Sequence, residues 1–255
     1  MKFEEIYERG YSYKESFFYG DMLEDSKLYE FAEGVFLLGK TSEDMELLWG
    51  VNNLEDLRSS IEKIKKENPD IKFIFRYGNS LNEVIEKEKI INQWGYKGKE
   101  IYVGYSCTLD NITCQEDSSS IEYLKREDIN EFLIFDRYLF DSLNITKNQL
   151  TTRLDDDHHI ILVYKKNKKI IGSIIIELYG RNNMNCFIRN VGVSEVERGK
   201  GFGKRLILSG LKEAKKKGAL KAMLWVGYDN IIARNLYEKI GFVLDESEAE
   251  VIFQV

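Results

Sequence analysis

The sequence Arg198-Gly199-Lys200-Gly201-Phe202-Gly203-Lys204 decides the fold of the C-terminal half of this chain. It follows an apolar run at 187–193 that is typical of a strand, and it precedes apolar residues with helical spacing, Leu206, Ile207, Leu208, Leu211 and Ala214. A glycine-rich turn at a helix start exposes backbone N–H groups that no helical hydrogen bond uses. Those donors, the positive end of the helix dipole and the flanking cations suit a pyrophosphate. The stretch therefore predicts a site for a cofactor that carries a diphosphate.

Three kinds of phosphate-binding loop compete for this stretch, and glycine clusters also make ordinary turns. A P-loop needs four residues between its glycines and a Ser or Thr after the Lys, whereas Arg205 stands at that position. A dinucleotide-binding turn needs a third glycine, where this chain has Lys204, and an earlier carboxylate than Asp229. The pattern R-x-x-G-x-G followed by a helix fits at every position, with Arg198, Gly201 and Gly203.

A second pattern begins about thirty residues later, at 230–242, and reads N-I-I-A-R-N-L-Y-E-K-I-G-F. Asp229 or Asn230 can cap a helix here, and Gly241 is placed to end it. Apolar residues three and four apart share one face of that helix: Ala233, Leu236, Tyr237 and Ile240. Two such patterns, separated by a helix and a strand, are far more specific than either one alone.

Together the two patterns closely resemble the acetyl-CoA loop and the second signature, N-x-x-A-x-x-L-Y-x-x-x-G-F, of the GNAT superfamily of N-acetyltransferases, over roughly residues 118–255. The resemblance implies an α/β fold in which helices flank a mixed sheet. The apolar periodicity agrees with that fold. It predicts strands at 120–124, 160–164, 170–178, 187–193 and 220–226, helices at 127–140 and 146–154, and two closing strands at 242–244 and 251–255.

The resemblance also implies which residues bind acetyl-CoA, the expected co-substrate, namely Val191, Val193, Arg198, Gly199, Lys200, Gly201, Phe202, Gly203, Lys204, Asn230 and Tyr237. Backbone groups at Val191 and Val193 would bind the pantetheine amides. The sequence does not distinguish a cofactor-binding role of Asn230 from a role as a helix cap alone. The basic residues that follow, from Lys212 to Lys217, are best read as a solvated helix face, although some cations there are candidates to meet the 3′-phosphate of CoA.

The implied reaction moves an acetyl group from acetyl-CoA to a primary amine of a small molecule, by direct attack through a tetrahedral intermediate. Tyr237 stands at the family's usual position for the general acid that protonates the leaving thiolate; the rival interpretation is a packing residue whose hydroxyl only contacts CoA. No general base is evident. Glu177, on the predicted third strand, is a candidate, and a strand carboxylate is more often simply exposed. The alternatives to an enzyme acting on small molecules are a catalytically silent acyl-CoA sensor, an interaction module, or a protein or peptide N-acetyltransferase.

Composition and charge limit the kinds of partner, compartment and metal that we expect for this chain. The net charge of −6 argues against general nucleic-acid binding and weakly favours a cationic amine as the acceptor. No apolar run approaches the length of a membrane span, the first residues are too charged for a signal peptide, and the three cysteines lack ligand spacing, so we expect a cytoplasmic protein without a metal. His158 and His159 next to Asp155–Asp157 suggest a metal only superficially, because adjacent strand residues point to opposite faces. A homodimer is compatible with these expectations.

The N-terminal half repeats the order of elements without the chemistry. Its periodicity predicts strands at 45–51, 71–77 and 100–107 and helices at 54–66 and 81–94. The first strand-to-helix turn, at 52–56, has two acids and no glycine or cation, and Ile91 stands where the second copy has Tyr237. We therefore expect a smaller, incomplete GNAT-like accessory domain at 1–115 and a catalytic domain at 116–255, with the polar residues 110–119 as the linker. An unrelated α/β domain with a chance pattern is the alternative.

Overall fold

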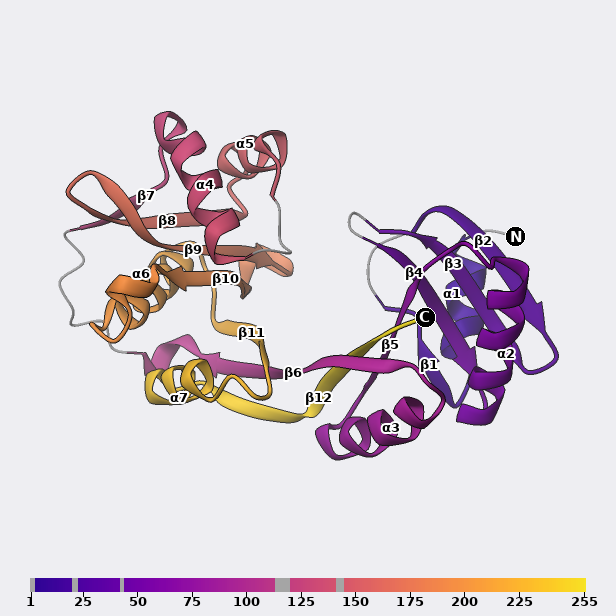
Figure 1. Cartoon of the computed structure of the whole chain (residues 1–255). Coiled ribbons are helices and arrows are strands. Elements are labelled where there is room, and N and C mark those ends of the chain that lie inside the picture. Colours follow the sequence, from indigo (N-terminus) through magenta and orange to yellow (C-terminus); the bar gives the residue numbers. More distant parts are fainter. Residues whose placement is uncertain (1–2, 20–22, 42–43, 113–119, 141–144) are drawn as a thin grey trace. The chain divides into compact units, whose positions relative to one another are not determined.

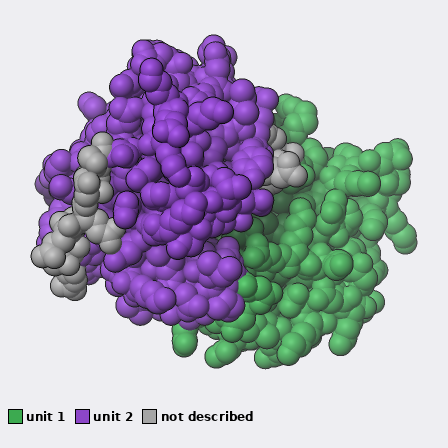
Figure 2. Space-filling model, turned by 60° about the vertical axis from the view of Figure 1, so that its left-hand side comes forward, with its two compact units in different colours: residues 1–103, 227–229, 246–255 green, residues 104–226, 230–245 purple. Residues whose placement is uncertain are grey.

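The computed structural model describes residues 3–19, 23–41, 44–112, 120–140 and 145–255 (Figure 1). The chain divides into two compact units, coloured separately in Figure 2. Unit 1 comprises residues 1–103, 227–229 and 246–255, and unit 2 comprises residues 104–226 and 230–245. These bounds differ from the predicted division at 115, because two long strands, β6 (Lys97–Thr108) and β12 (Val243–Gln254), each contribute residues to both units. Most of the predicted linker lies outside the described residues.

Unit 2 has the mixed α/β architecture that the sequence predicts. Its strands follow the order β11-β10-β9-β8-β7, and β6 lies beside β11. Its further elements are β7 (Ile121–Tyr123), α4 (Ile129–Leu139), α5 (Lys147–Asp155), β8 (His159–Lys166), β9 (Lys169–Tyr179), β10 (Asn185–Val193), α6 (Phe202–Lys216), β11 (Lys221–Gly227) and α7 (Ile231–Ile240). The predicted elements of this half are confirmed, apart from the two closing strands, which are one strand, β12.

Helices cover both faces of the unit 2 sheet. Side chains of α4 and α5, such as Phe132 and Leu150, form one core cluster with Ile161 of β8 and Ile175 of β9. On the opposite face α6 packs closely, since a Cβ at Gly210 would lie 2.6 Å from Ile176 Cδ1. From Ser173 onward, past a register shift near the start of β9, alternation along the strand then assigns odd-numbered residues to the α4/α5 face. Glu177 of β9 therefore lies on the same face as Ile175.

The parallel strands β10 and β11 separate soon after they meet. Their register pairs Asn185 with Lys221 through Phe187 with Met223, and no later pair is found among the described residues. On its other edge β10 pairs with β9 as far as Val193, with a bulge that leaves Arg189 unpaired. The β11-facing edge of β10 from 188 to 193 therefore borders an opening in the sheet.

Unit 1 repeats this order of elements, with additional ones before it. It contains α1 (Phe3–Tyr11), β1 (Glu15–Phe17), β2 (Glu24–Phe31), β3 (Gly34–Lys40), β4 (Met45–Val51), α2 (Leu54–Glu67), β5 (Ile74–Asn79) and α3 (Leu81–Gln93). Its strand order is β2-β3-β4-β5-β12, and β4 pairs parallel to β5 as β10 does to β11. The five elements predicted for this half are confirmed, although β5 begins three residues later than predicted. Within the described ranges, none of the helices has the length and apolar character that a membrane crossing needs.

A short strand fills the corresponding opening in unit 1. The strands β4 and β5 pair only at Glu46–Ile74 and Leu47–Phe75. Because β3 pairs along the whole of β4, the antiparallel partner β1 must take the other edge of β4, the edge that faces β5. The ring of Phe17 on β1 reaches Gly78 of β5, where a Cβ would lie 2.9 Å away. Unit 1 therefore closes with its own chain the gap that unit 2 leaves open.

Candidate functional site

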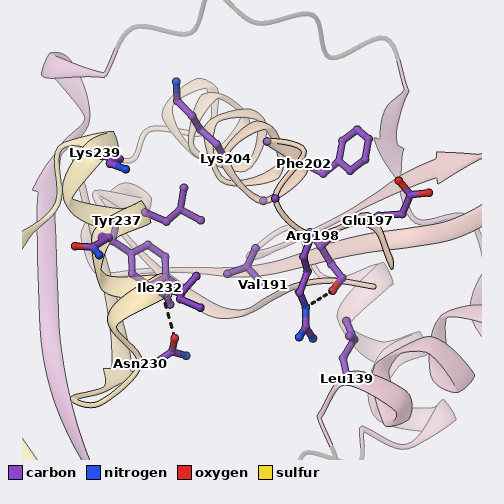
Figure 3. Close-up of a pocket in the computed structure, with 18 of the residues that line it drawn as sticks. Leu139, Val191, Glu197, Arg198, Phe202, Lys204, Asn230, Ile232, Tyr237 and Lys239 are labelled. Carbon is purple, nitrogen blue, oxygen red and sulfur yellow. Dashed lines mark hydrogen bonds between the residues drawn. The ribbon is translucent and has the colours of Figure 1, made fainter. Parts of the chain in front are cut away.

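A cleft of about 760 Å³ occupies the opening in unit 2 (Figure 3). It is lined by the end of α4, the second half of β10, the loop before α6 and one face of α7. All but one of the predicted cofactor-binding residues line it: Val191, Val193, Arg198, Gly199, Gly201, Phe202, Gly203, Lys204, Asn230 and Tyr237. The exception is Lys200, and Glu177 is also absent from the lining.

The glycine loop presents the start of α6 to the cleft. Gly199 and Gly201 adopt φ values of 76° and 82°, which residues other than glycine adopt only with strain. Gly201 is the N-cap residue of α6, and no side chain caps this end of the helix. The first backbone N–H groups of a helix have no intrahelical acceptor, so this end offers donors and a partial positive charge. Such an end can bind an anion with its main chain.

Two predicted cations of the loop hold the loop itself. Arg198 Nε donates to the carbonyl of Val193 at 3.2 Å, which ties the loop to the end of β10. Lys200 Nζ donates to Val196 O at 2.8 Å and to Glu197 Oε2 at 2.9 Å. The hydrogen bonds that Glu197 accepts from Lys166 and Lys200 lower the pKa of its carboxyl group. The side chain of Lys200 therefore stabilises the loop, and Lys200 does not line the cleft.

Tyr237 projects from α7 into the same cleft (Figure 3). Its side chain is 7% exposed, and its ring packs against those of Tyr105 and Phe242 with centroids 6.4 and 5.8 Å away. Burial raises the pKa of Tyr237 to about 12, so the phenol is protonated at neutral pH. A protonated phenol on the wall of a cleft can donate a hydrogen bond or a proton to a bound group.

The rest of α7 is fixed by neighbouring elements. Asn230 Oδ1 accepts from the N–H of Ala233 at 3.1 Å and so caps the helix, while the residue also lines the cleft. At the other end Gly241, with φ 113°, stops the helix as predicted. Tyr105 of β6 donates its hydroxyl to Glu238 at 2.8 Å and accepts from Arg234 Nε at 3.0 Å. These contacts set the position of Tyr237.

Glu177 lies apart from the cleft lining, on the α4/α5 face of β9. Its carboxylate accepts from Arg189 Nε at 2.6 Å, and Arg189 is the residue at the bulge of β10. The carboxylate is therefore already engaged by Arg189, and it does not line the cleft. A role for Glu177 as the general base therefore remains a prediction that this pairing does not favour.

Sequence reasoning missed several cleft residues. Leu139 and Phe140, at the end of α4, approach β10 so closely that a Cβ at Gly192 would lie 2.5 Å from Leu139 Cδ1. Ile232 and Lys239 of α7 also line the cleft. The α7 residues stand within the second signature at its variable positions, and the α4 residues belong to another element, so neither pattern identifies them.

The histidine pair makes a carboxylate contact. The Nδ1 atoms of His158 and His159 lie 2.9 and 2.8 Å from the two oxygens of Asp156. These contacts, together with the N–H of His158, lower the pKa of Asp156 to about 2. Across the described part of the chain, no three or more His, Cys, Asp or Glu side chains are grouped to hold a metal ion.

Comparison with known proteins agrees with this geometry. Residues 122–242 match the sequence model of the acetyltransferase (GNAT) family. A mycothiol acetyltransferase of Renibacterium salmoninarum is 44% identical over 52 residues, which are 20% of this chain and 15% of that protein. An uncharacterized N-acetyltransferase of Methanocaldococcus jannaschii is 26% identical over 145 residues, 52% of this chain and 62% of that protein. The matches thus span less than two thirds of these relatives.

Solved structures share the fold over both units. A GCN5-related N-acetyltransferase from Sphaerobacter thermophilus superposes with a TM-score of 0.65 at 14% identity, covering 88% of this chain and 80% of that one. A GNAT-family acetyltransferase from Colwellia psychrerythraea gives a TM-score of 0.62 at 13% identity, covering 100% and 97%. Identities this low show a common fold and no more. The family match, the glycine loop at the start of α6 and the cleft beside β10 lead to one conclusion: residues 122–242 form a GNAT acetyltransferase domain.

Proposed function

We propose that this protein transfers the acetyl group of acetyl-CoA to a primary amine of a small molecule, in the cleft of unit 2. The observation that carries the proposal is the combination of an uncapped helix start, an open strand edge and a buried phenol around one cleft. Enzymes of the GNAT family use acetyl-CoA as co-substrate. The unbonded thiols of Cys107 and Cys186 fit a reducing compartment, which supports a cytoplasmic location.

The residues of the loop suit the diphosphate of CoA. A Cβ at Gly199 or Gly201 would meet nothing within 4 Å, so the space over both residues is open to a ligand. The N–H groups at the start of α6 would donate to the phosphate oxygens, because that end of the helix lacks a side-chain cap. Lys204 and Lys239 add positive charge on the walls of the cleft.

From the loop, the pantetheine arm would follow the open edge of β10. The amides of the pantetheine arm would form hydrogen bonds with backbone groups at Val191 and Val193, as a peptide does when it adds to a sheet edge. The carbonyl of Val193 already accepts from Arg198, so Val191 offers the freer carbonyl. The acceptor amine attacks the thioester carbonyl, and a β10 N–H facing the oxyanion would stabilise the tetrahedral intermediate.

Tyr237 would give its proton to the departing thiolate. A thiol has a pKa near 8.5 in water, so a phenol of pKa about 12 would be a poor donor to an exposed thiolate. A buried thiolate is far more basic, and this chain supplies an example, since burial raises the pKa of the Cys186 thiol to about 12. Bound CoA would shield a thiolate beside Tyr237 from water in the same way, which would raise its pKa toward that of the phenol and favour the transfer.

A small acceptor is supported by one group of relatives, whose names specify mycothiol. Because the matched segment covers only 15% to 20% of those two relatives, their acceptor is not carried over to this chain. The test is calorimetry with acetyl-CoA, followed by thiol release across a panel of amines. Binding with turnover of at least one amine is expected. Binding without turnover of any amine would favour the acyl-CoA sensor.

A matched pair of variants tests the loop. Gly201→Asp should weaken acetyl-CoA binding at least about tenfold, because it strains the backbone and brings a negative charge to the phosphates. Gly95→Asp is the control, since Gly95 also has positive φ, 94°, with nothing within 4 Å of its Cβ position, and belongs to unit 1. No binding by the wild-type protein, or equal effects of both substitutions, would contradict the proposal.

A further inference from the structure

A polar cluster lies on the α4/α5 face of unit 2, outside the set of residues that line the cleft, and only its Asp136 is fully buried. It consists of Asp136 on α4, Arg153 on α5, Glu177 on β9, and Arg189 and Asn190 on β10. Within it, Glu177 and Arg189 neutralise each other at 2.6 Å. The other two charges are not satisfied in this way.

Within the described part of the chain, the carboxylate of Asp136 accepts no hydrogen bond of ordinary geometry. The side chain is 1% exposed. Burial raises the pKa of Asp136 to about 6, an effect that the nearby Asn190 amide and the charge of Arg153 partly offset. The group is therefore mostly ionised at neutral pH. A buried, ionised and unbonded carboxylate is costly, and it is retained where a ligand satisfies it.

Arg153 carries a half-buried guanidinium group that also lacks a hydrogen-bond partner among the described residues. Burial lowers its pKa, as does the charge of Arg189, while Glu177 and Asp136 raise it. Arg153 and Asp136 thus sense each other's charge, yet across the described chain Arg153 makes no ion pair or hydrogen bond. A guanidinium whose five N–H donors lack protein acceptors is suited to an acidic group of a ligand.

The position of the cluster places it where the acceptor must arrive. Diphosphate at the loop fixes the cofactor's entry at the carboxyl end of β10, so its acetyl end lies toward the point where β10 and β11 meet at Phe187. On the α4/α5 face Gly192 lies under Leu139, which lines the cleft. One strand step nearer the closed end, Asn190 lies beside Asp136, one helical turn before Leu139.

We infer that Asp136 and Arg153 bind the acceptor as a zwitterion, the carboxylate of Asp136 meeting its ammonium group and the guanidinium of Arg153 meeting an acidic group on the same molecule. The bound ammonium group must lose one proton to solvent before the amine attacks the thioester. The inference rests on the proposed function, and it narrows the acceptor from any small amine to amino acids and similar molecules. It also explains why, among the described residues, neither charge forms an ion pair or a hydrogen bond of ordinary geometry, since each finds its partner only when the acceptor is bound.

The experiment compares acceptors that differ in one charge. The purified full-length chain is given acetyl-CoA with free amino acids, with their methyl esters and with simple alkylamines, and released thiol is measured. At least one free amino acid should give a kcat/KM at least about tenfold above that of its ester, since a hydrogen bond to a charged group is worth about tenfold or more. Esters and alkylamines accepted equally well, or no amino acid accepted while acetyl-CoA binds, would overturn the inference.

Variants separate the two charges. Arg153→Ala should lower kcat/KM for the free amino acid by roughly 10- to 100-fold and leave its ester unchanged, and Arg153→Lys should restore part of the preference. Asp136→Asn should lower kcat/KM for both. Arg137→Ala is the control, because Arg137 is exposed on the next position of α4 and carries the same charge. An unchanged preference in Arg153→Ala would overturn the inference. Acetyl-CoA binding is measured for every variant, because its loss from the wild type would instead contradict the proposed function.

Discussion

Replacing Asp136 by Asn should make unit 2 more stable at neutral pH. The pKa of this carboxyl rises from 3.8 to about 6 in the folded chain, with burial as the main cause. For an acid with a raised folded pKa, the folded state binds the proton more tightly between the two values. The contribution of Asp136 to stability is therefore most favourable below about pH 4, falls as the pH rises from about 4 to 6, and carries the full cost of the buried charge above that range. An amide has no charge to bury and escapes this cost.

The size of the gain follows from the shift. A change from 3.8 to about 6 corresponds to at most about 3 kcal/mol, because one pKa unit is about 1.4 kcal/mol. The gain is smaller than this limit for two reasons. Solvent screens the half-exposed groups around Asp136, and an Asn amide brings N–H donors that need acceptors of their own. We expect Asp136→Asn to raise the free energy of unfolding by about 1–2 kcal/mol at pH 7.5, or roughly 2–8 °C in melting temperature.

Hydrogen exchange on peptides from β8 to β10, with urea unfolding of the whole chain, measures this gain at pH 7.5 and near pH 4. The gain should vanish at the lower pH, where the wild-type carboxyl is also neutral. Asp157→Asn is the control, since Asp157 is fully exposed and its removal should change stability by less than about 0.5 kcal/mol. A loss of stability in Asp136→Asn at pH 7.5, or a gain that does not depend on pH, would refute the reasoning.

Three further outcomes test the site. Tyr237→Phe should lower kcat by about 10²–10⁴-fold and leave the affinity for acetyl-CoA nearly unchanged. Tyr105→Phe is the control: it loses contacts to Glu238 and Arg234 and should lower kcat by less than about tenfold. Equal losses of kcat in the two variants would argue against proton donation by Tyr237. Lys239→Ala should weaken CoA binding several-fold, and more at low salt than at high salt, while Lys200→Ala should weaken it less because Lys200 is bound to Glu197. Calorimetry should find one acetyl-CoA per chain, since β1 fills the opening of unit 1, and a second site would contradict that reading.

The parts of the site that the sequence predicts are those fixed by local rules. Positive φ at Gly201, the cap at Asn230 and the stop at Gly241 each follow from the chemistry of one residue, and all three are found. Outside the site, the two-residue turn between β8 and β9 obeys a local rule of the same kind. Asn167 and Lys168 both adopt positive φ there, as a two-residue turn requires.

Asp136 was missed, although the sequence holds a signal for it. It follows Ile129 and Phe132 on the apolar face of its helix at helical spacing, so it occupies a core position. A charged residue at such a position is either paired or functional. The partners that decide between the two, Arg153 and Asn190, come from other elements, and their proximity depends on tertiary packing.

The strand β12 was predicted as two short strands for a physical reason. Its middle, residues 245–248, is polar and contains no buried residue, so it lacks the alternation that identifies a strand. These residues lie where the strand passes from unit 2 to unit 1, and beyond them Ala249 to Gln254 pair with β5. The strand β12 is continuous because its backbone pairs with neighbouring strands, and backbone pairing cannot be recognised from the sequence of side chains.

The two units show why one copy of this topology keeps a binding cleft and the other does not. When parallel strands separate, each leaves a row of backbone donors and acceptors that must find partners. In unit 1, β1 supplies them to β4, and the Trp49 side chain donates to the carbonyl of Arg76 at 2.8 Å across the gap. In unit 2, the edge of β10 beyond Phe187 has no strand partner among the described residues. An edge that the fold leaves open, beside a helix start that no side chain caps, is best accounted for by a ligand that completes both.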